Sequence, residues 1–121
     1  MLIVYTHQFK KDLKKLSKKY PSVVDDLEIF ERALIHNPTG KDTNKHWNEI
    51  SDIGNIFNTL SFFKVRMMCR SLKGTHLRVI YTYDNAIDEI SLIELYYKSN
   101  KVNYNKSRID AVISTYSKNN S

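Results

Sequence analysis

The sequence predicts an α+β fold: a small antiparallel sheet of about four strands, packed by an N-terminal helical hairpin and followed by a C-terminal helix. Three observations support this fold class. Residues 9–34 repeat apolar side chains at helical spacing, whereas residues 62–97 alternate apolar and polar side chains as strands do. The chain of 121 residues, 41% of them hydrophobic and 26% charged, has the size and composition of one soluble domain. We expect a single domain over residues 1–116 and a disordered tail over residues 117–121.

The N-terminal part predicts a short strand over residues 2–5 and then two helices. In the first helix the apolar residues are spaced four, three and four apart, at Phe9, Leu13, Leu16 and Tyr20. Pro21 separates this helix from a second one, whose apolar positions are Val23, Leu27, Phe30 and Leu34. The segment from His36 to Gly40 ends the second helix. The two apolar stripes face each other in a helical hairpin.

The C-terminal part predicts three strands and a final helix. Residues 41–60 fit neither period, so we interpret them as a loop that Trp47 and several isoleucines attach to the core. The strands are expected over residues 62–70, 77–83 and 89–97, with turns at residues 71–75 and 84–88. The final helix begins after a cap at Asn105 or Ser107. It carries its apolar residues at Ile109, Val112, Ile113 and Tyr116.

One face of the predicted strand over residues 62–70 is cationic. Residues 53–83 contain no acidic residue but include Lys64, Arg66, Arg70, Lys73 and Arg78. Alternation places Lys64, Arg66 and Arg70 on one face of the strand and an apolar set on the other: Phe63, Val65, Met67 and Cys69. Cations fixed this closely repel one another unless an anion neutralises them, and a phosphate backbone is the commonest such partner. Together with the net charge of +6, the pattern favours a nucleic acid as partner.

Cysteine and histidine usage argues against disulfide and metal sites. A single cysteine, Cys69, excludes an internal disulfide and a cysteine metal cluster, and it is typical of a reducing cytoplasm. His7, His36 and His46 have no mutual spacing that would build a metal site. The apolar run over residues 2–5 is too short for a signal peptide, and no run reaches membrane-spanning length. We expect a cytoplasmic protein without a metal or another cofactor.

Four stretches of the chain resemble the RelE/ParE superfamily of type II toxin–antitoxin toxins. They read FKKDLKKLSKKYP, ALIHNP, FKVRMMCRSLKGTHLRVIYTYD and ISLIELYYKSNKVNYNKSRI. The most telling pieces are FKVR at residues 63–66 and LRVIY at residues 77–81, which look like the "Y-K-I-R … Y-R-V-I-Y" pair of central strands in that family. The resemblance covers nearly the whole chain and rests on element order, size and charge together.

The resemblance implies a toxin that enters the ribosomal A site and cuts the messenger RNA there. Such an endoribonuclease uses the RNA 2′-hydroxyl as the nucleophile and needs no metal. The protein must align the chain, stabilise a dianionic phosphorane and assist proton transfer. The implied partners are mRNA on the ribosome and a cognate antitoxin, whose acidic segment would cover Lys64, Arg66 and Arg78.

Carried over residue by residue, the resemblance suggests five catalytic candidates. Arg78 matches the arginine that opens the R-V-I-Y strand, Lys64 and Arg66 match a basic pair on the neighbouring strand, and Lys98 lies where the family has a basic cluster. Their alternatives are a salt bridge to a carboxylate for Arg78 and a solvated strand face for the pair. Glu94 is a candidate general base, but it could instead neutralise Arg66 or Arg78.

Three residues near the predicted turn are candidates for binding RNA. Arg70 and Lys73 lie where this chain has a longer turn than the shorter family members, and a solvated turn is an equally good interpretation. His76 could bind RNA or act as the base, because its ordinary pKa is near 6.5. Simple solvent exposure is the alternative for His76, and a lysine of the cationic face is a third candidate for the base.

Two further candidates for binding RNA follow the third predicted strand. Lys101 belongs to the basic cluster there, and Tyr104 lies close to a tyrosine that some relatives stack on a base. A helix-docking aromatic is the alternative for Tyr104. Tyr96 and Tyr97, which end the strand, are interpreted as packing residues.

Two rival functions share these features. A ParE-like inhibitor of DNA gyrase has the same fold without nuclease activity, although such toxins generally lack an assembled cationic strand face. A catalytically inactive relative that binds RNA or an antitoxin is the other rival, because the sequence contains no obvious catalytic base.

Overall fold

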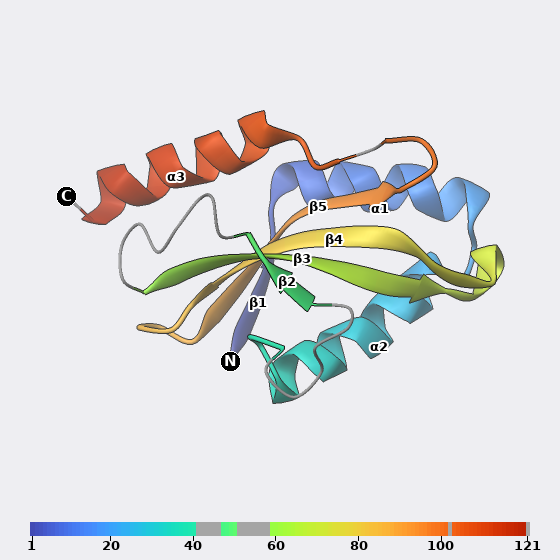
Figure 1. Ribbon diagram of the computed structural model, residues 1–121, viewed down its shortest axis with the longest axis horizontal. Coiled ribbons are helices and arrows are strands. Elements are labelled where there is room, and N and C mark those ends of the chain that lie inside the picture. The colour runs from blue at the N-terminus through green and yellow to red at the C-terminus, as the bar shows by residue number, and fades with distance from the viewer. Residues whose placement is uncertain (41–46, 51–58, 102, 121) are drawn as a thin grey trace.

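The computed structural model describes residues 1–40, 47–50, 59–101 and 103–120 (Figure 1). Its elements follow in the order β1 (Leu2–Tyr5), α1 (His7–Lys19), α2 (Val23–His36), β2 (Trp47–Glu49), β3 (Leu60–Cys69), a short 3-10 turn (Arg70–Leu72), β4 (Gly74–Asp84), β5 (Glu89–Tyr97) and α3 (Lys106–Asn120). The predicted α+β class and the helical hairpin are confirmed. Most of the predicted loop over residues 41–60, and the proposed anchoring by the side chain of Trp47, lie outside the described residues.

The sheet has five strands in the order β1-β5-β4-β3-β2, against about four expected. The added strand, β2, pairs antiparallel with β3. It is three residues long, which is too short to show a period in sequence. The sheet is mixed and not purely antiparallel, because β1 pairs parallel with β5. The strands β2, β3 and β4 all lie on one side of β5, so the other edge of β5 is open to β1.

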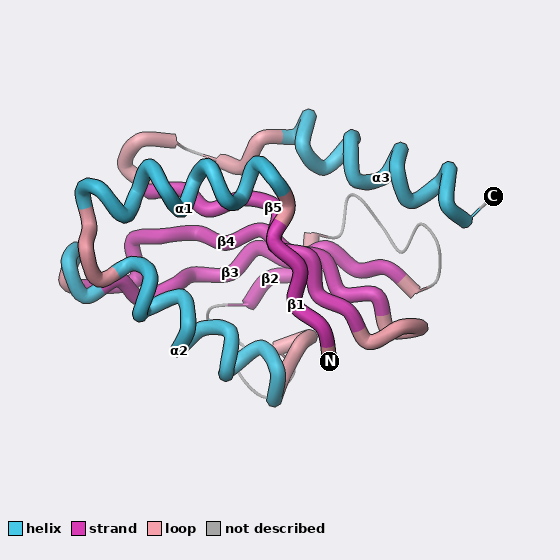
Figure 2. Tube along the Cα trace, turned by 180° about the vertical axis from the view of Figure 1, so that it is seen from behind, coloured by secondary structure: helices cyan, strands magenta, loops and turns pink. Residues whose placement is uncertain are grey.

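The two helices of the hairpin cover one face of the sheet (Figure 2). Thr6 is the N-cap of α1, and its hydroxyl accepts a hydrogen bond from the backbone N–H of Phe9 at 3.3 Å. The apolar stripe of α2 packs on the apolar face predicted for β3, namely Phe63, Val65, Met67 and Cys69, while that of α1 packs on β5. This face forms the larger of two hydrophobic clusters and contains the fully buried Phe9, Leu34 and Val79.

The opposite face of the sheet carries α3 and a smaller hydrophobic cluster. Ile109 of α3 is buried there with Phe62, Ile80 and Ile93, while Val112, Ile113 and Tyr116 pack around them. Asn105 is the cap of α3, because its side chain accepts a hydrogen bond from the N–H of Ser107 at 3.0 Å. The helix continues to Asn120, past the domain boundary expected at residue 116.

A bulge in β5 decides which side chains reach this second face. Ile80 pairs with Glu94 and Tyr81 pairs with Leu92, so Ile93 has no partner on β4. Leu92 and Leu95 belong to the larger cluster, so the bulge places the two consecutive residues between them, Ile93 and Glu94, on the same face. After the bulge, Glu94 and Tyr96 lie on the face that carries α3. None of the helices in the described ranges is long and apolar enough to cross a membrane.

Candidate functional site

A small cavity of about 140 Å³ opens on the sheet face that carries α3. It is lined by Asn48, Lys64, Arg66, Arg78, Tyr96 and Lys98. Four of the five residues predicted to be catalytic therefore line one cavity, although they are spread over 35 positions of sequence. The fifth, Glu94, does not line it.

The register of three neighbouring strands brings these side chains together. Arg66 on β3 lies directly opposite Arg78 on β4, and Arg78 lies directly opposite Tyr96 on β5. Directly opposed residues share a face and have Cβ atoms roughly 4.5–5.5 Å apart. Two arginines in that relation repel each other, so this arrangement is unfavourable for the protein without a bound anion.

Arg78 is the most enclosed cation of the cavity, with 6% of its surface exposed. Its Nη1 donates hydrogen bonds to the carbonyl oxygens of Thr75 at 2.7 Å and Leu77 at 3.1 Å. Burial lowers the pKa of Arg78 from its ordinary value, and the neighbouring charge of Arg66 lowers it further. Both hydrogen bonds use Nη1, and within the described part of the chain Nε and Nη2 have no acceptor.

The four cations of the cavity have no carboxylate partner among the described residues: no ion pair forms there for Lys64, Arg66, Arg78 or Lys98. Lys64 donates a hydrogen bond of 3.5 Å to the side-chain oxygen of Asn103, which follows β5. The salt bridge considered as an alternative for Arg78 is therefore not seen in the described part of the chain. The cavity is a cluster of fixed positive charge that suits an anion.

Tyr96 is a lining residue that sequence reasoning interpreted only as packing. Its side chain is 6% exposed, and its hydroxyl has no hydrogen-bond partner among the described residues. Burial raises the pKa of Tyr96 to about 12, and the charge of Glu94 raises it as well. The one available signal in the sequence was that Tyr96 and Lys98 lie two residues apart and so share a face.

Glu94 lies two residues before Tyr96 on the same face of β5 but does not line the cavity, and 2% of its surface is exposed. Its carboxylate forms an ion pair with Lys101 and accepts a hydrogen bond from the backbone N–H of Asn105 at 2.7 Å. Lys101 in turn lies 5.6 Å from the centre of the Tyr96 ring. Glu94 and Lys101 thus hold the segment between β5 and α3 against Tyr96, and the partner of Glu94 is Lys101 instead of the expected Arg66 or Arg78.

Arg70 lies away from the cavity, which differs from the face predicted for it. Its Nε donates to Asp26 of α2 at 2.7 Å, and its backbone N–H donates to the same carboxylate at 2.9 Å. The reason is that β3 ends at Cys69 and Arg70 begins the 3-10 turn, so strand alternation no longer sets its direction. Arg70 therefore turns toward the helical hairpin instead of sharing the face of Lys64 and Arg66.

None of the three remaining RNA-binding candidates lines the cavity. Lys73 is exposed in the turn and adopts a left-handed backbone conformation, with φ of 55°. His76 is exposed, its ring centre lies 6.4 Å from that of Tyr97, and its carbonyl accepts from the N–H of Lys98 at 3.0 Å. Tyr104 is half-buried against the smaller hydrophobic cluster, which favours the helix-docking interpretation.

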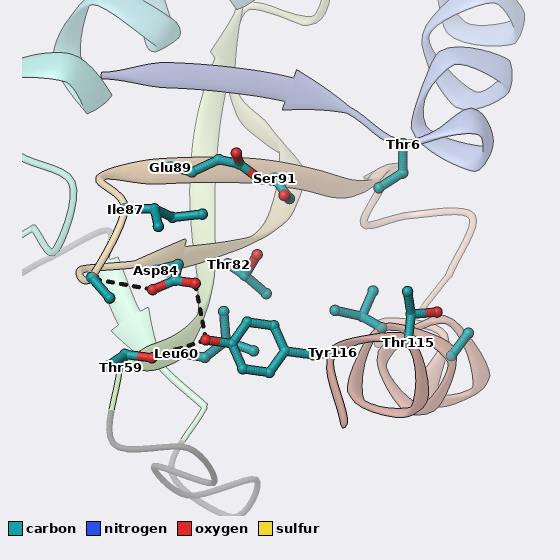
Figure 3. Close-up of a pocket in the computed structure, with 13 residues that line it drawn as sticks. Thr6, Thr59, Leu60, Thr82, Asp84, Ile87, Glu89, Ser91, Thr115 and Tyr116 are labelled. Atoms are coloured by element: carbon teal, nitrogen blue, oxygen red, sulfur yellow. Dashed lines mark hydrogen bonds between the residues drawn. The ribbon is translucent and has the colours of Figure 1, made fainter. Parts of the chain in front are cut away.

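A larger hollow of about 880 Å³ lies between α3 and the far ends of β4 and β5 (Figure 3). Hydroxyl and carboxylate side chains line it, among them Thr82, Asp84 and Glu89, and no lysine or arginine does. Asp84 is engaged there, since it accepts from the hydroxyl of Tyr116 and from the N–H of Ala86. This hollow is unsuited to a phosphate. No group of three potential metal ligands occurs among the described residues.

Comparison with known proteins finds a similarity of structure, although the sequence matches no family model. No curated protein matches the sequence either. Among solved structures, the chain is similar to one from the archaeal RelE–RelB complex of Pyrococcus horikoshii OT3, with a TM-score of 0.57 and 18% sequence identity. The similarity covers 80% of this chain and 93% of the other. The fold is therefore RelE-like, as the sequence resemblance predicts.

Proposed function

We propose that this protein is the toxin of a type II toxin–antitoxin module and cuts messenger RNA at the cationic cavity. The observation that supports this most strongly is the set of four cations that line one cavity without a described carboxylate partner. The RelE-like fold agrees with the proposal. A ribosome-dependent endoribonuclease is the activity that both features favour.

The size of the cavity indicates which part of the RNA it would hold. Pockets for whole small-molecule ligands measure roughly 300–1,000 Å³. At about 140 Å³ this cavity fits a phosphodiester group, with the bases and riboses on either side outside it. Arg78 and Arg66, opposed across two strands, are placed to bind two oxygens of the same phosphate.

In the proposed reaction the ribose 2′-oxygen attacks the adjacent phosphorus, and the bond from phosphorus to the 5′-oxygen breaks. The products are a 2′,3′-cyclic phosphate and a 5′-hydroxyl, and the proton lost by the 2′-hydroxyl is balanced by the proton that the 5′-oxygen gains. The lining residues include no carboxylate and no imidazole. We therefore assign the main acceleration to alignment of the phosphate and to stabilisation of the dianionic phosphorane by Arg78, Arg66, Lys64 and Lys98.

Glu94 and Lys101 receive a positioning role in this proposal. Their ion pair lies behind Tyr96, and the bond from Asn105 to Glu94 fixes the segment that leads into α3. A cognate antitoxin with an acidic segment would neutralise the same cavity and so block it. The structural relative was solved as a RelE–RelB complex, which agrees with such a partner.

Primer extension on a reporter mRNA after brief induction tests the proposal in cells. Wild-type protein should produce cuts within codons that disappear when translation is blocked, and Arg78→Ala should produce none. Arg32→Ala is the matched control, because Arg32 is an exposed arginine on α2. Growth arrest with intact mRNA and broken DNA would identify a gyrase inhibitor instead, and absence of arrest would identify an inactive binding protein.

A further inference from the structure

The hydroxyl of Tyr96 is buried but has no hydrogen-bond partner among the described residues. More than about 90% of buried polar groups in proteins have a hydrogen-bond partner. The Tyr96 hydroxyl is the only buried side-chain nitrogen or oxygen without one among the described residues. It belongs to a residue that lines the cationic cavity, directly opposite Arg78 on the neighbouring strand. An unsatisfied donor at that point indicates a missing acceptor.

The aromatic ring of Tyr96 is held in place without help from its hydroxyl. It packs in the smaller hydrophobic cluster with Ile80, Ile93 and Ile109. Lys101 lies over the ring, and its own position is fixed by the ion pair with Glu94. Phenylalanine would satisfy each of these contacts equally well, so packing alone does not account for the hydroxyl.

The hydroxyl carries its proton at neutral pH and is therefore a donor. Burial, the strongest influence, raises the pKa of Tyr96 to about 12, and the negative charge of Glu94 acts in the same direction. A protonated phenol opposite Arg78 would add a neutral donor to a charged phosphate site. A neutral donor binds an oxyanion without adding to the repulsion between Arg66 and Arg78.

We propose that Tyr96 is a further catalytic residue, whose hydroxyl donates a hydrogen bond to a non-bridging oxygen of the scissile phosphodiester beside Arg78. This inference rests on the proposed ribonuclease function. Tyr96 transfers no proton in this role: the same bonds form and break as described above. The bond is worth more to the phosphorane than to the diester, because the phosphorane carries one more negative charge on its oxygens.

The test compares Tyr96→Phe with wild type on ribosomes programmed with a defined mRNA, with single-turnover cleavage as the readout. We expect cleavage to slow by about 10²-fold, the lower end of the range for loss of one oxyanion donor. Affinity for the same mRNA carrying a 2′-deoxy nucleotide at the cleavage site, which cannot be cut, should stay within about threefold. Tyr97→Phe is the matched control, because Tyr97 is adjacent but packs on the other face of the sheet. Equal cleavage by wild type and Tyr96→Phe would overturn the inference and leave the ribonuclease function standing.

A second measurement does not depend on cleavage. Inorganic phosphate should raise the Tm of the wild type, and it should raise that of Tyr96→Phe by less. In the absence of phosphate, Tyr96→Phe should melt at the wild-type temperature or above it, because a buried hydroxyl without a partner has been removed. A lower Tm would show a structural role and contradict the proposal. If wild type binds phosphate through Tyr96 but cuts no RNA, the phosphate site stands and the ribonuclease function fails.

Discussion

Arg70 and Arg78 belong to the same basic segment, but the fold surrounds them differently. Arg70 leaves 59% of its side chain exposed, and it is still bound to the buried Asp26 at 2.7 Å. Arg78 is 6% exposed and has no carboxylate partner among the described residues. Exposure is therefore a poor guide to which arginine is free to bind an anion. Arg70 pairs with a carboxylate of the fold, whereas Arg78 has no described counter-charge.

The surroundings of Arg70 join α2 to the turn between β3 and β4. Asp26 accepts three hydrogen bonds: two from Arg70, and one of 2.8 Å from the hydroxyl of Ser22. Ser22 and Ser71 also bond to each other, since the backbone N–H of each donates to the hydroxyl of the other. In the cavity, by contrast, Arg66 and Arg78 oppose each other with no described carboxylate between them. The charges of Arg70 and Asp26 are paired, whereas those of Arg66 and Arg78 have no described counter-charge.

The largest expected effect is a difference in mRNA cleavage between variants of Arg78 and Arg70. Arg78→Ala should slow cleavage of ribosome-bound mRNA by about 10²–10³-fold, because it removes a charged donor to the phosphorane. Arg70→Ala should cleave at nearly the wild-type rate, since Arg70 is bound to Asp26 and lies away from the cavity. Single-turnover cleavage with both variants measures the difference. Equal losses of cleavage rate in the two variants would show that Arg70 also contacts the RNA. The assignment of a structural role to Arg70 and a catalytic role to Arg78 would then be wrong.

The next effect is a difference in the free energy of unfolding between variants of the Asp26–Arg70 pair and variants of the cavity. Asp26→Asn should lower the free energy of unfolding by about 2 kcal/mol, because hydrogen bonds to a charged group each contribute roughly 1.5–3 kcal/mol and Arg70 is partly solvated. Urea unfolding measures this change. Cleavage per folded molecule should remain unchanged. Arg66→Ala is the reciprocal control: it should reduce cleavage without loss of stability, because it removes a repulsive neighbour of Arg78.

A smaller effect is expected from Glu94→Gln, which weakens the support behind Tyr96. The ion pair with Lys101 is lost, while the glutamine oxygen can still accept from the N–H of Asn105. Cleavage should fall by about three- to tenfold through looser placement of Tyr96, with the shape of its pH dependence kept. A general base would behave differently, since its removal costs about 10²–10⁴-fold and removes its ionisation from the pH profile. That result would assign the proton transfer to Glu94.

The sequence predicts the parts of this molecule that depend on unbroken periodicity. The hairpin of α1 and α2 follows from apolar spacing, and the shared face of Lys64 and Arg66 follows from alternation along β3. Arg70 departs from the same rule because the strand ends at Cys69 and Arg70 belongs to the 3-10 turn that follows. The three residues of β2 are too few for any period, and the parallel pairing of β1 with β5 joins segments that are more than 80 residues apart.

Two features of the site could not be predicted because they depend on partners in space. Glu94 pairs with Lys101 across the turn that follows β5, a contact that strand alternation does not describe. The unsatisfied hydroxyl of Tyr96 is a property of the packed structure, because only the finished hydrogen-bond network shows which donor lacks an acceptor. The cations were identifiable from the resemblance to a family. The neutral donor beside them was not.

The smallest expected effect is on the pH dependence of the free energy of unfolding, which should differ between the Asp26–Arg70 pair and the cavity. Burial would raise the pKa of Asp26, but hydrogen bonds from the Arg70 backbone, the Ser22 hydroxyl and the Arg70 side chain outweigh it, so the pKa is lowered from 3.8. A lowered pKa in the folded state means that Asp26 contributes stability above pH 4 and loses this contribution as the pH falls through its folded value. The stability difference between wild type and Asp26→Asn should therefore shrink below about pH 4 in urea unfolding. Arg66→Ala should show no such convergence with wild type, because the cavity lining contains no carboxylate to titrate there. A difference for Asp26→Asn that stays constant down to pH 2 would mean that the ion pair with Arg70 adds little, and that Asp26 acts only through packing and neutral hydrogen bonds.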